Sequence, residues 1–289
     1  MKEGETKLAD AKGKFAQVVK DGRKVPDIEW VPGRVLLSNR RLILASKQGK
    51  RTIPLADVSS IKSQEDAENP LAKVSNYISL QVEADVTLIS PKNHQKFEHA
   101  LYDAVLDQQV VAVKHPAVKG GVVQDTTWEK GRLTTELADG NIALALASGQ
   151  FVEIELDDIG IVEENEGQVL GDERFFIEVE HTEEEAAVQT YISGPRRKTN
   201  ILAELFRKSE QQHTTDVELS EEENAVVMAL YSGVSPFQIP DFVGLDVETV
   251  EEIYDNLIEA GILQEQRVRR DVQLKARGRN IASEAMGEE

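Results

Sequence analysis

Trp30-Val31-Pro32-Gly33-Arg34-Val35 and Trp128-Glu129-Lys130-Gly131-Arg132-Leu133 share one pattern of Trp, Gly, Arg and an apolar residue, and this pattern decides the fold. The two blocks lie 98 residues apart. Further matched landmarks follow them: Gly49 with Gly149, Leu55–Val58 with Leu156–Ile159, and Thr87–Pro91 with Thr190–Pro195. Low complexity would not reproduce matched Trp, Gly and Asp positions, so the pattern predicts a duplicated domain with loop insertions.

The first unit is predicted to consist of short antiparallel strands followed by one helix. Strands are expected at residues 34–37, 41–44, 51–55, 77–83 and 86–89, joined by turns such as Ser38-Asn39-Arg40 and by a polar loop at 63–70. Alternating apolar and polar residues at 77–83 are typical of a strand with one buried face. After Pro91, a helix is predicted to bury Phe97, Leu101, Ala104 and Val105 on one face.

The second unit repeats this plan. Strands are expected at residues 141–147, 151–156, 175–180 and 187–192, with an acidic loop at 163–173 and a closing helix that carries Ile201, Leu202, Leu205 and Phe206. A meander of strands closed by one C-terminal helix is the pattern of the pleckstrin-homology-like (PH-like) or GRAM-like superfold. In that fold the helix covers the open end of a curved sheet, but the fold alone does not fix a function.

The last part of the chain has the pattern of a winged helix-turn-helix domain. Ser220 and Glu223 form a capping box before a first helix, and Ser235-Pro236-Phe237 opens a short second helix. Asp246 is predicted to cap a third helix that ends before Gly261. Residues 264–274 are expected to form a two-stranded wing, followed by a closing helix.

These patterns together predict an α+β chain with two tandem PH-like/GRAM-like antiparallel β domains, each closed by a C-terminal helix, followed by a winged-helix domain. The expected domains are residues 1–115, residues 116–214 as an internal repeat of the first, and residues 215–289.

Charge is distributed unevenly over these parts. The formal net charge is −19, but residues 1–115 carry 18 basic and 15 acidic side chains, whereas residues 116–216 have a net charge of −12 and residues 217–289 of −10. An acidic chain is unsuited to general nucleic-acid binding, because duplex affinity comes largely from Lys and Arg on phosphates. The acidity indicates either adaptation to concentrated salt or local partner surfaces, and adaptation does not explain the first domain.

The sequence offers no catalytic constellation. It contains no Cys, no phosphate-binding glycine loop and no nucleophile elbow, and its acidic clusters lack the spacing of calcium loops. We therefore expect no enzyme activity, catalytic residue, metal or cofactor. The N-terminus lacks the apolar run of a secretory signal, and no segment reaches 18 consecutive apolar residues, so a cytoplasmic protein without membrane insertion is predicted.

Two basic clusters are candidate protein-binding sites. The first comprises Arg40, Arg41, Lys47, Lys50 and Arg51. It is interpreted as a solvated strand edge protected against aggregation, as a docking surface for an acidic partner, or as a lipid headgroup site. The second comprises Arg267, Arg269 and Arg270, which could pair with the acidic third helix, bind protein or contact nucleic acid. The third helix contains no Lys or Arg, which favours protein recognition over DNA.

The Trp30–Leu44 block, the segment Lys12-Gly13-Lys14-Phe15 before it and the winged-helix tail give the chain its resemblance to the archaeal taxis protein family CheF. The acidic balance suggests a haloarchaeal member. The resemblance implies a non-enzymatic adaptor that couples the response regulator CheY, in its phosphorylated form, and the deamidase CheD to accessory proteins of the archaellum motor, so that rotation can switch. The alternative is a winged-helix transcriptional regulator with PH-like sensor domains, and a third class is an adaptor on a lipid surface.

Overall fold

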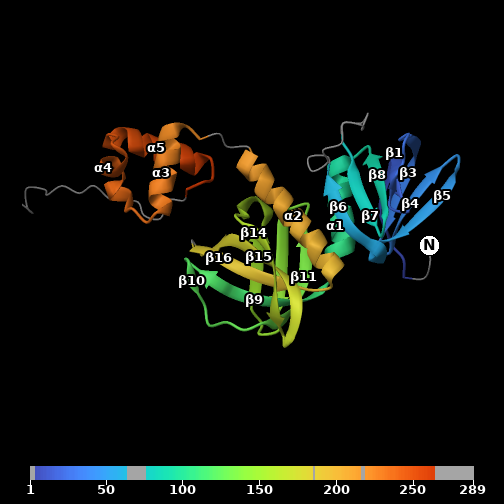
Figure 1. Ribbon diagram of the computed structural model, residues 1–289, viewed down its shortest axis with the longest axis horizontal. Coiled ribbons are helices and arrows are strands. Elements are labelled where there is room, and N and C mark those ends of the chain that lie inside the picture. The colour runs from blue at the N-terminus through green and yellow to red at the C-terminus, as the bar shows by residue number, and fades with distance from the viewer. Residues whose placement is uncertain (1–3, 64–75, 185, 216–218, 264–289) are drawn as a thin grey trace, which may run out of the picture. The chain divides into compact units, whose positions relative to one another are not determined.

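The computed structural model describes residues 4–63, 76–184, 186–215 and 219–263. The chain is of the α+β class, with two antiparallel β-sheets and several helices (Figure 1). It divides into two compact units, residues 1–216 and 217–289. Both sheets belong to the first unit.

The first sheet has the strand order β5-β4-β3-β1-β8-β7-β6, with β2 paired to β1. Its strands are β1 (Lys7–Lys20), β2 (Arg23–Lys24), β3 (Val31–Ser38), β4 (Arg41–Ser46), β5 (Gly49–Pro54), β6 (Val58–Ser63), β7 (Ile78–Val82) and β8 (Asp85–Pro91). The short 3₁₀ helix η1 (Leu55–Asp57) precedes β6, and helix α1 (His94–Leu106) follows β8. Phe97, Leu101 and Val105 on α1 are buried, as their spacing predicts.

The second sheet has the equivalent order β13-β12-β11-β9-β16-β15-β14, with β10 paired to β9. Its strands are β9 (Val110–Lys119), β10 (Val122–Val123), β11 (Glu129–Glu136), β12 (Asn141–Leu146), β13 (Phe151–Glu155), β14 (Val162–Val169), β15 (Asp172–Glu183) and β16 (Ala186–Ser193). The 3₁₀ helix η3 (Leu156–Asp158) and helix α2 (Arg196–Thr215) occupy the places of η1 and α1. The repeat in the sequence therefore corresponds to a repeat in topology.

Three sequence expectations need correction. The acidic loop predicted at residues 163–173 is wrong, because these residues form most of β14 and the start of β15, paired in a hairpin. The strands β1 and β9, each at the centre of its sheet, were not predicted. The boundary predicted after residue 115 falls inside β9, whose pairing partners all lie in the second sheet.

Both sheets share one hydrophobic core. Its buried residues come from strands of both sheets and from both α1 and α2. Helix α2 packs against β6 of the first sheet as well as against β14 and β15 of its own. Helix α2 therefore packs on both sheets, whereas the sequence pattern predicted a separate closing helix for each sheet.

Polar contacts fasten α2 to the first sheet. The Glu204 carboxylate accepts hydrogen bonds from the Ser60 hydroxyl at 2.8 Å and from the Ile61 backbone N–H at 3.1 Å. Because β6 is an edge strand, this carboxylate satisfies a backbone donor that no neighbouring strand can reach. Lys208 lies 3.0 Å from the buried carboxylate of Glu98 on α1.

The two tryptophans lie at the margins of the sheets. Trp30 is half-buried beside Tyr77 in a small satellite cluster that also contains Val18 and Leu88. Trp128 is half-buried and contacts the rings of Phe176 and Tyr191. Both tryptophans therefore anchor aromatic or apolar clusters at the rims of their sheets.

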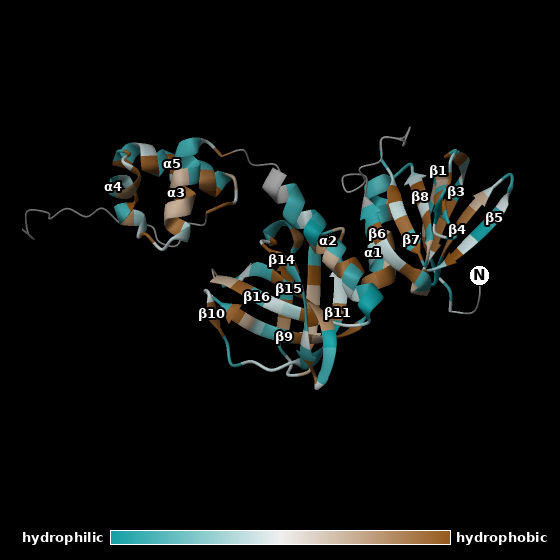
Figure 2. Cartoon of the chain, viewed as in Figure 1, coloured by the Kyte–Doolittle hydropathy of each residue, from teal (hydrophilic) through white to brown (hydrophobic). Residues whose placement is uncertain are grey.

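The second unit contains α3 (Glu221–Tyr231), the 3₁₀ helix η4 (Pro236–Gln238), α4 (Ile239–Val243) and α5 (Val247–Glu259) around its own small core. The capping box of Ser220 and Glu223 is present, and Asp246 accepts a hydrogen bond from the Thr249 N–H. Figure 2 shows apolar and polar residues alternating around these helices. The predicted wing and closing helix lie outside the described residues.

Candidate docking surface

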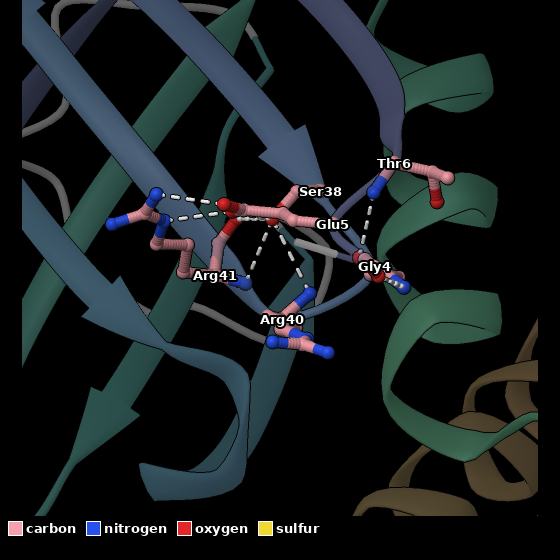
Figure 3. Close-up of polar contacts among 7 residues, drawn as sticks. Gly4, Glu5, Thr6, Ser38, Arg40 and Arg41 are labelled. Carbon is pink, nitrogen blue, oxygen red and sulfur yellow. Dashed lines mark hydrogen bonds and ion pairs between the residues drawn. The ribbon is translucent and has the colours of Figure 1, made fainter. Parts of the chain in front are cut away.

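The predicted basic hairpin is divided by the structure into internal and exposed cations. Arg41, the first residue of β4, makes two hydrogen bonds of 2.7 Å to the Glu5 carboxylate. The Glu5 side chain is only 1% exposed and also accepts a hydrogen bond from the Ser38 hydroxyl at 2.8 Å (Figure 3). Arg41 therefore holds the N-terminal segment against the β3–β4 turn, and its guanidinium is used in a contact within the fold.

Arg51 on β5 is similarly engaged within the first sheet. Its guanidinium donates to Gln17 Oε1 at 3.2 Å and to Thr87 Oγ1 at 3.0 Å, and it lies 3.4 Å from the Asp85 carboxylate. The sequence could not indicate this, because Gln17, Thr87 and Asp85 come from β1 and β8.

Arg40, Lys47 and Lys50 are exposed, and none of them belongs to an ion pair among the described residues. Arg40 lies in the β3–β4 turn, whereas Lys47 and Lys50 lie at the β4–β5 turn, at the other end of β4. Arg267, Arg269 and Arg270 lie outside the described residues.

A basic groove that the sequence reasoning missed lies on the first sheet. It has a volume of about 660 Å³ and carries four cationic side chains, Lys12, Lys14, Arg34 and Lys92. Its other lining residues are Gly13, Pro32, Gly33, Asn76, Ser90, Pro91 and His94. We call this feature the cationic groove.

The register of three strands brings these cations together. Lys12 on β1 lies opposite Arg34 on β3, and the Lys92 N–H, directly after β8, donates to the Lys12 carbonyl at 2.9 Å. Arg34 is also paired with Ala45, and Ala45 with Lys50, so Lys50 lies in the same cross-strand row. The alternation Lys12-Gly13-Lys14 was the available signal, since alternate residues of a strand share one face.

Two positions on the strands of the cationic groove require glycine. Gly13 lies opposite both Gly33 and Pro91. A Cβ atom on Gly13 would collide with the Ser90 carbonyl, and one on Gly33 would collide with the Ala45 carbonyl. The strands approach closely here, and because side chains alternate along a strand, these Cβ positions lie on the face opposite Lys12, Lys14 and Arg34.

One carboxylate partly neutralises the positive charge on the face of the sheet that carries the cationic groove. Asp10 accepts two hydrogen bonds from Arg34, at 2.6 and 2.8 Å, and lies 3.4 Å from Lys7. The hydrogen bond from Arg34 lowers the pKa of Asp10, so this carboxylate stays ionised. Among the described residues, Lys12, Lys14 and Lys92 take part in no ion pair, and all three are exposed.

The second sheet contains a different polar network, built on two buried histidines. Thr190 Oγ1 lies 2.7 Å from His115 Nδ1 and 2.8 Å from His181 Nε2, and His115 Nε2 lies 3.1 Å from the Glu183 carboxylate. Because a carboxylate only accepts, His115 carries its proton on Nε2 and receives the Thr190 O–H on Nδ1. Thr190 can then accept the His181 Nε2–H.

This network fits neutral imidazoles. Burial lowers the pKa of His115, against the opposing effect of Glu183, and Lys119 lowers it further. Burial and the neighbouring His115 lower the pKa of His181, whereas the Thr182 backbone, Glu183 and Asp158 act in the opposite direction. Within the described residues, His181 Nδ1 is buried without a hydrogen-bond partner, as fits the unprotonated nitrogen of a neutral ring.

We expect the second sheet to lose stability on mild acidification. The pKa of each histidine is lower in the folded protein than in the unfolded chain. The stabilisation that the neutral histidines contribute is therefore complete above the ordinary imidazole pKa of about 6.5. It is lost as the pH falls from there toward the pKa of the folded state. Unfolding midpoints measured by Trp128 fluorescence between pH 7.5 and 5.5 should fall, and His181→Leu should reduce this slope. An unchanged slope in His181→Leu would contradict the assignment.

No group of three His, Asp or Glu side chains within the described residues is arranged to hold a metal ion. No helix within the same residues is long and apolar enough to cross a membrane.

Comparison with known proteins agrees with the resemblance given by the sequence. Residues 7–212 match the family model of the archaeal chemotaxis signal transduction system protein F, and residues 218–287 match a domain of unknown function. The chain is 47% identical to taxis protein CheF1 of Halobacterium salinarum over 292 aligned residues, which cover 100% of both proteins. It is 28% identical to taxis protein CheF2 of the same haloarchaeon over 81% of this chain and 85% of that protein. The chain therefore belongs to the archaeal CheF family of chemotaxis signal transduction proteins.

Proposed function

We propose that this protein is a non-enzymatic cytoplasmic adaptor in archaeal taxis. It binds the phosphorylated response regulator CheY and the deamidase CheD, and passes the signal to accessory proteins of the archaellum motor so that rotation can switch. Membership of a chemotaxis signal transduction family supports the taxis role. The partners are those that the family resemblance implies.

The observation that carries this proposal is the exposed positive charge of the first sheet. Arg40, Lys47 and Lys50, together with the cationic groove, are basic surfaces on a chain of net charge −19. Response regulators carry acidic phosphoacceptor sites, so opposite charges would steer the two proteins together. The shared core and α2 provide a rigid base for such a surface.

The modules of this adaptor are proposed to be two PH-like β domains and a winged-helix domain. The shared strand order of the two sheets and the capped helices of the second unit support these readings. We propose that the winged-helix module binds protein. Residues 219–263 contain no Lys or Arg, so this surface would repel nucleic-acid phosphates.

Charge reversal at Arg40 and Lys47 tests the CheY assignment. The double variant Arg40→Glu/Lys47→Glu should weaken capture of phosphorylated CheY in a pull-down roughly tenfold, because two attractive contacts become repulsive. Arg41 is unsuitable for this test, since its loss leaves the buried Glu5 without its cation.

Two outcomes would contradict the proposal. Unchanged capture by the double variant would exclude electrostatic docking at this hairpin. Gel shifts with duplex DNA whose affinity falls steeply with salt would favour the transcriptional-regulator alternative, and co-sedimentation with anionic liposomes would favour a lipid-surface adaptor.

A further inference from the structure

We infer that the cationic groove is a docking site for an acidic helical face of a partner protein. This inference rests on the proposed adaptor function, but it assigns the contact to residues outside the basic hairpin. The groove is open, and its three lysines are exposed and without ion pairs among the described residues. Its charge is the opposite of that of the chain as a whole.

The duplicated sheet shows that the fold does not require these cations. Strand register makes Val110 the equivalent of Lys12, because Val110 pairs with Arg132 as Lys12 pairs with Arg34. By the same register, Ala112 replaces Lys14, and Phe151 replaces Lys50 through its pairing with Ala145.

The equivalent row in the second sheet is therefore largely apolar. Val110 is 56% exposed and Phe151 is 61% exposed, so both side chains stand on the surface as the lysines do. A sheet of the same topology therefore folds with uncharged residues at these positions. Folding alone does not explain the lysines of the first sheet.

The geometry of the row fits a helix rather than a single anion. Lys92, Lys12 and Arg34 follow one another across β8, β1 and β3, where neighbouring strands are about 4.8 Å apart. Carboxylates three or four residues apart on a helix have Cβ atoms about 5–6 Å apart. An acidic helix lying across the strands would place successive carboxylates over successive cations.

The neighbours of this row leave its lysines available to the same occupant. Gly13 and Gly33 alternate with Lys12, Lys14 and Arg34 along their strands, so they project no side chain onto this face. The Asp10 carboxylate fixes Arg34 by its two hydrogen bonds and leaves the lysines as the movable contacts.

The inference is tested by substitutions that introduce the residues found at the equivalent positions of the second sheet. Lys12→Val/Lys14→Ala copies Val110 and Ala112 and removes two charges. Lys130→Ala/Arg132→Ala removes two charges from exposed positions of the second sheet and serves as the matched control. The probe is a synthetic helical peptide with glutamates on one face, and a second peptide of equal composition spreads them around the helix.

We expect the full-length protein to bind the one-faced peptide, and Lys12→Val/Lys14→Ala to weaken this binding roughly tenfold. The matched control should change it less than about twofold, since net charge alone acts weakly at a distance. Equal weakening in both variants, or equal binding of both peptides, would overturn the inference. Circular dichroism of each variant verifies folding.

Phosphorylated CheY in the same assay separates this inference from the proposed function. If wild type binds the one-faced peptide through the groove but not CheY, the partner assignment fails and the groove assignment holds. If CheY binds wild type and Lys12→Val/Lys14→Ala equally well, the adaptor function holds and the groove assignment fails.

Discussion

Phe206→Ala is expected to destabilise both sheets together, by about 3–5 kcal/mol. Phe206 lies on α2, is fully buried and belongs to the core that both sheets share. Truncation to alanine removes a large apolar side chain and leaves a cavity, and the helix affected also packs on β6 of the first sheet. Denaturant unfolding followed by tryptophan fluorescence measures this loss.

The two tryptophans allow each sheet to be followed separately. Trp128→Phe leaves Trp30 as the reporter of the first sheet, and Trp30→Phe leaves Trp128 as the reporter of the second. Phe206→Ala should shift both transitions equally. A shift seen only through Trp128 would mean that the sheets unfold independently. Val226→Ala, in the separate core of the second unit, should leave both transitions unchanged.

Gly33→Ala is expected to cost roughly 1–3 kcal/mol or more, through overpacking between strands. The added Cβ would meet the Ala45 carbonyl and lie 2.8 Å from the Phe15 ring. The carbonyl belongs to the paired strand β4, so it cannot move without disturbing the sheet. Unfolding midpoints reported by Trp30 should fall accordingly.

The repeat again supplies the matched control. At Gly131, the equivalent glycine, a Cβ would meet the end of the Leu146 side chain at 3.0 Å and the Val113 side chain at 3.2 Å. Side chains can adjust, so Gly131→Ala should cost less than Gly33→Ala. Equal costs at the two glycines would show that the close approach of β3 and β4 is not the cause.

The local elements of this fold could largely be predicted from the sequence. The β3–β4 hairpin follows from apolar runs around Ser38-Asn39-Arg40, and α3 begins at its capping box. Such signals act over a few residues, so they can be read from the sequence alone. The central strands β1 and β9 were missed. The first half of β1 alternates charged residues with Ala and Gly, which bury little apolar surface, and the apolar run that begins β9 is interrupted by Lys114, His115 and Pro116.

The candidate site was predictable only in part. Lys47 and Lys50 are exposed as expected, whereas Arg41 and Arg51 serve internal contacts with Glu5 and Asp85. A basic residue has the same appearance in the sequence whether it faces solvent or a buried carboxylate. Its partner comes from a distant strand, and only strand pairing determines which one.

The sequence by itself determined the duplication, the class of most elements and the uneven charge, because these depend on composition and short-range periodicity. The tertiary structure decided that α2 joins both sheets through one core and that Lys12, Arg34 and Lys92 lie in one row across three strands. These features depend on the register between strands far apart in the chain. A shift of one residue in that register would turn the same side chains to the opposite face.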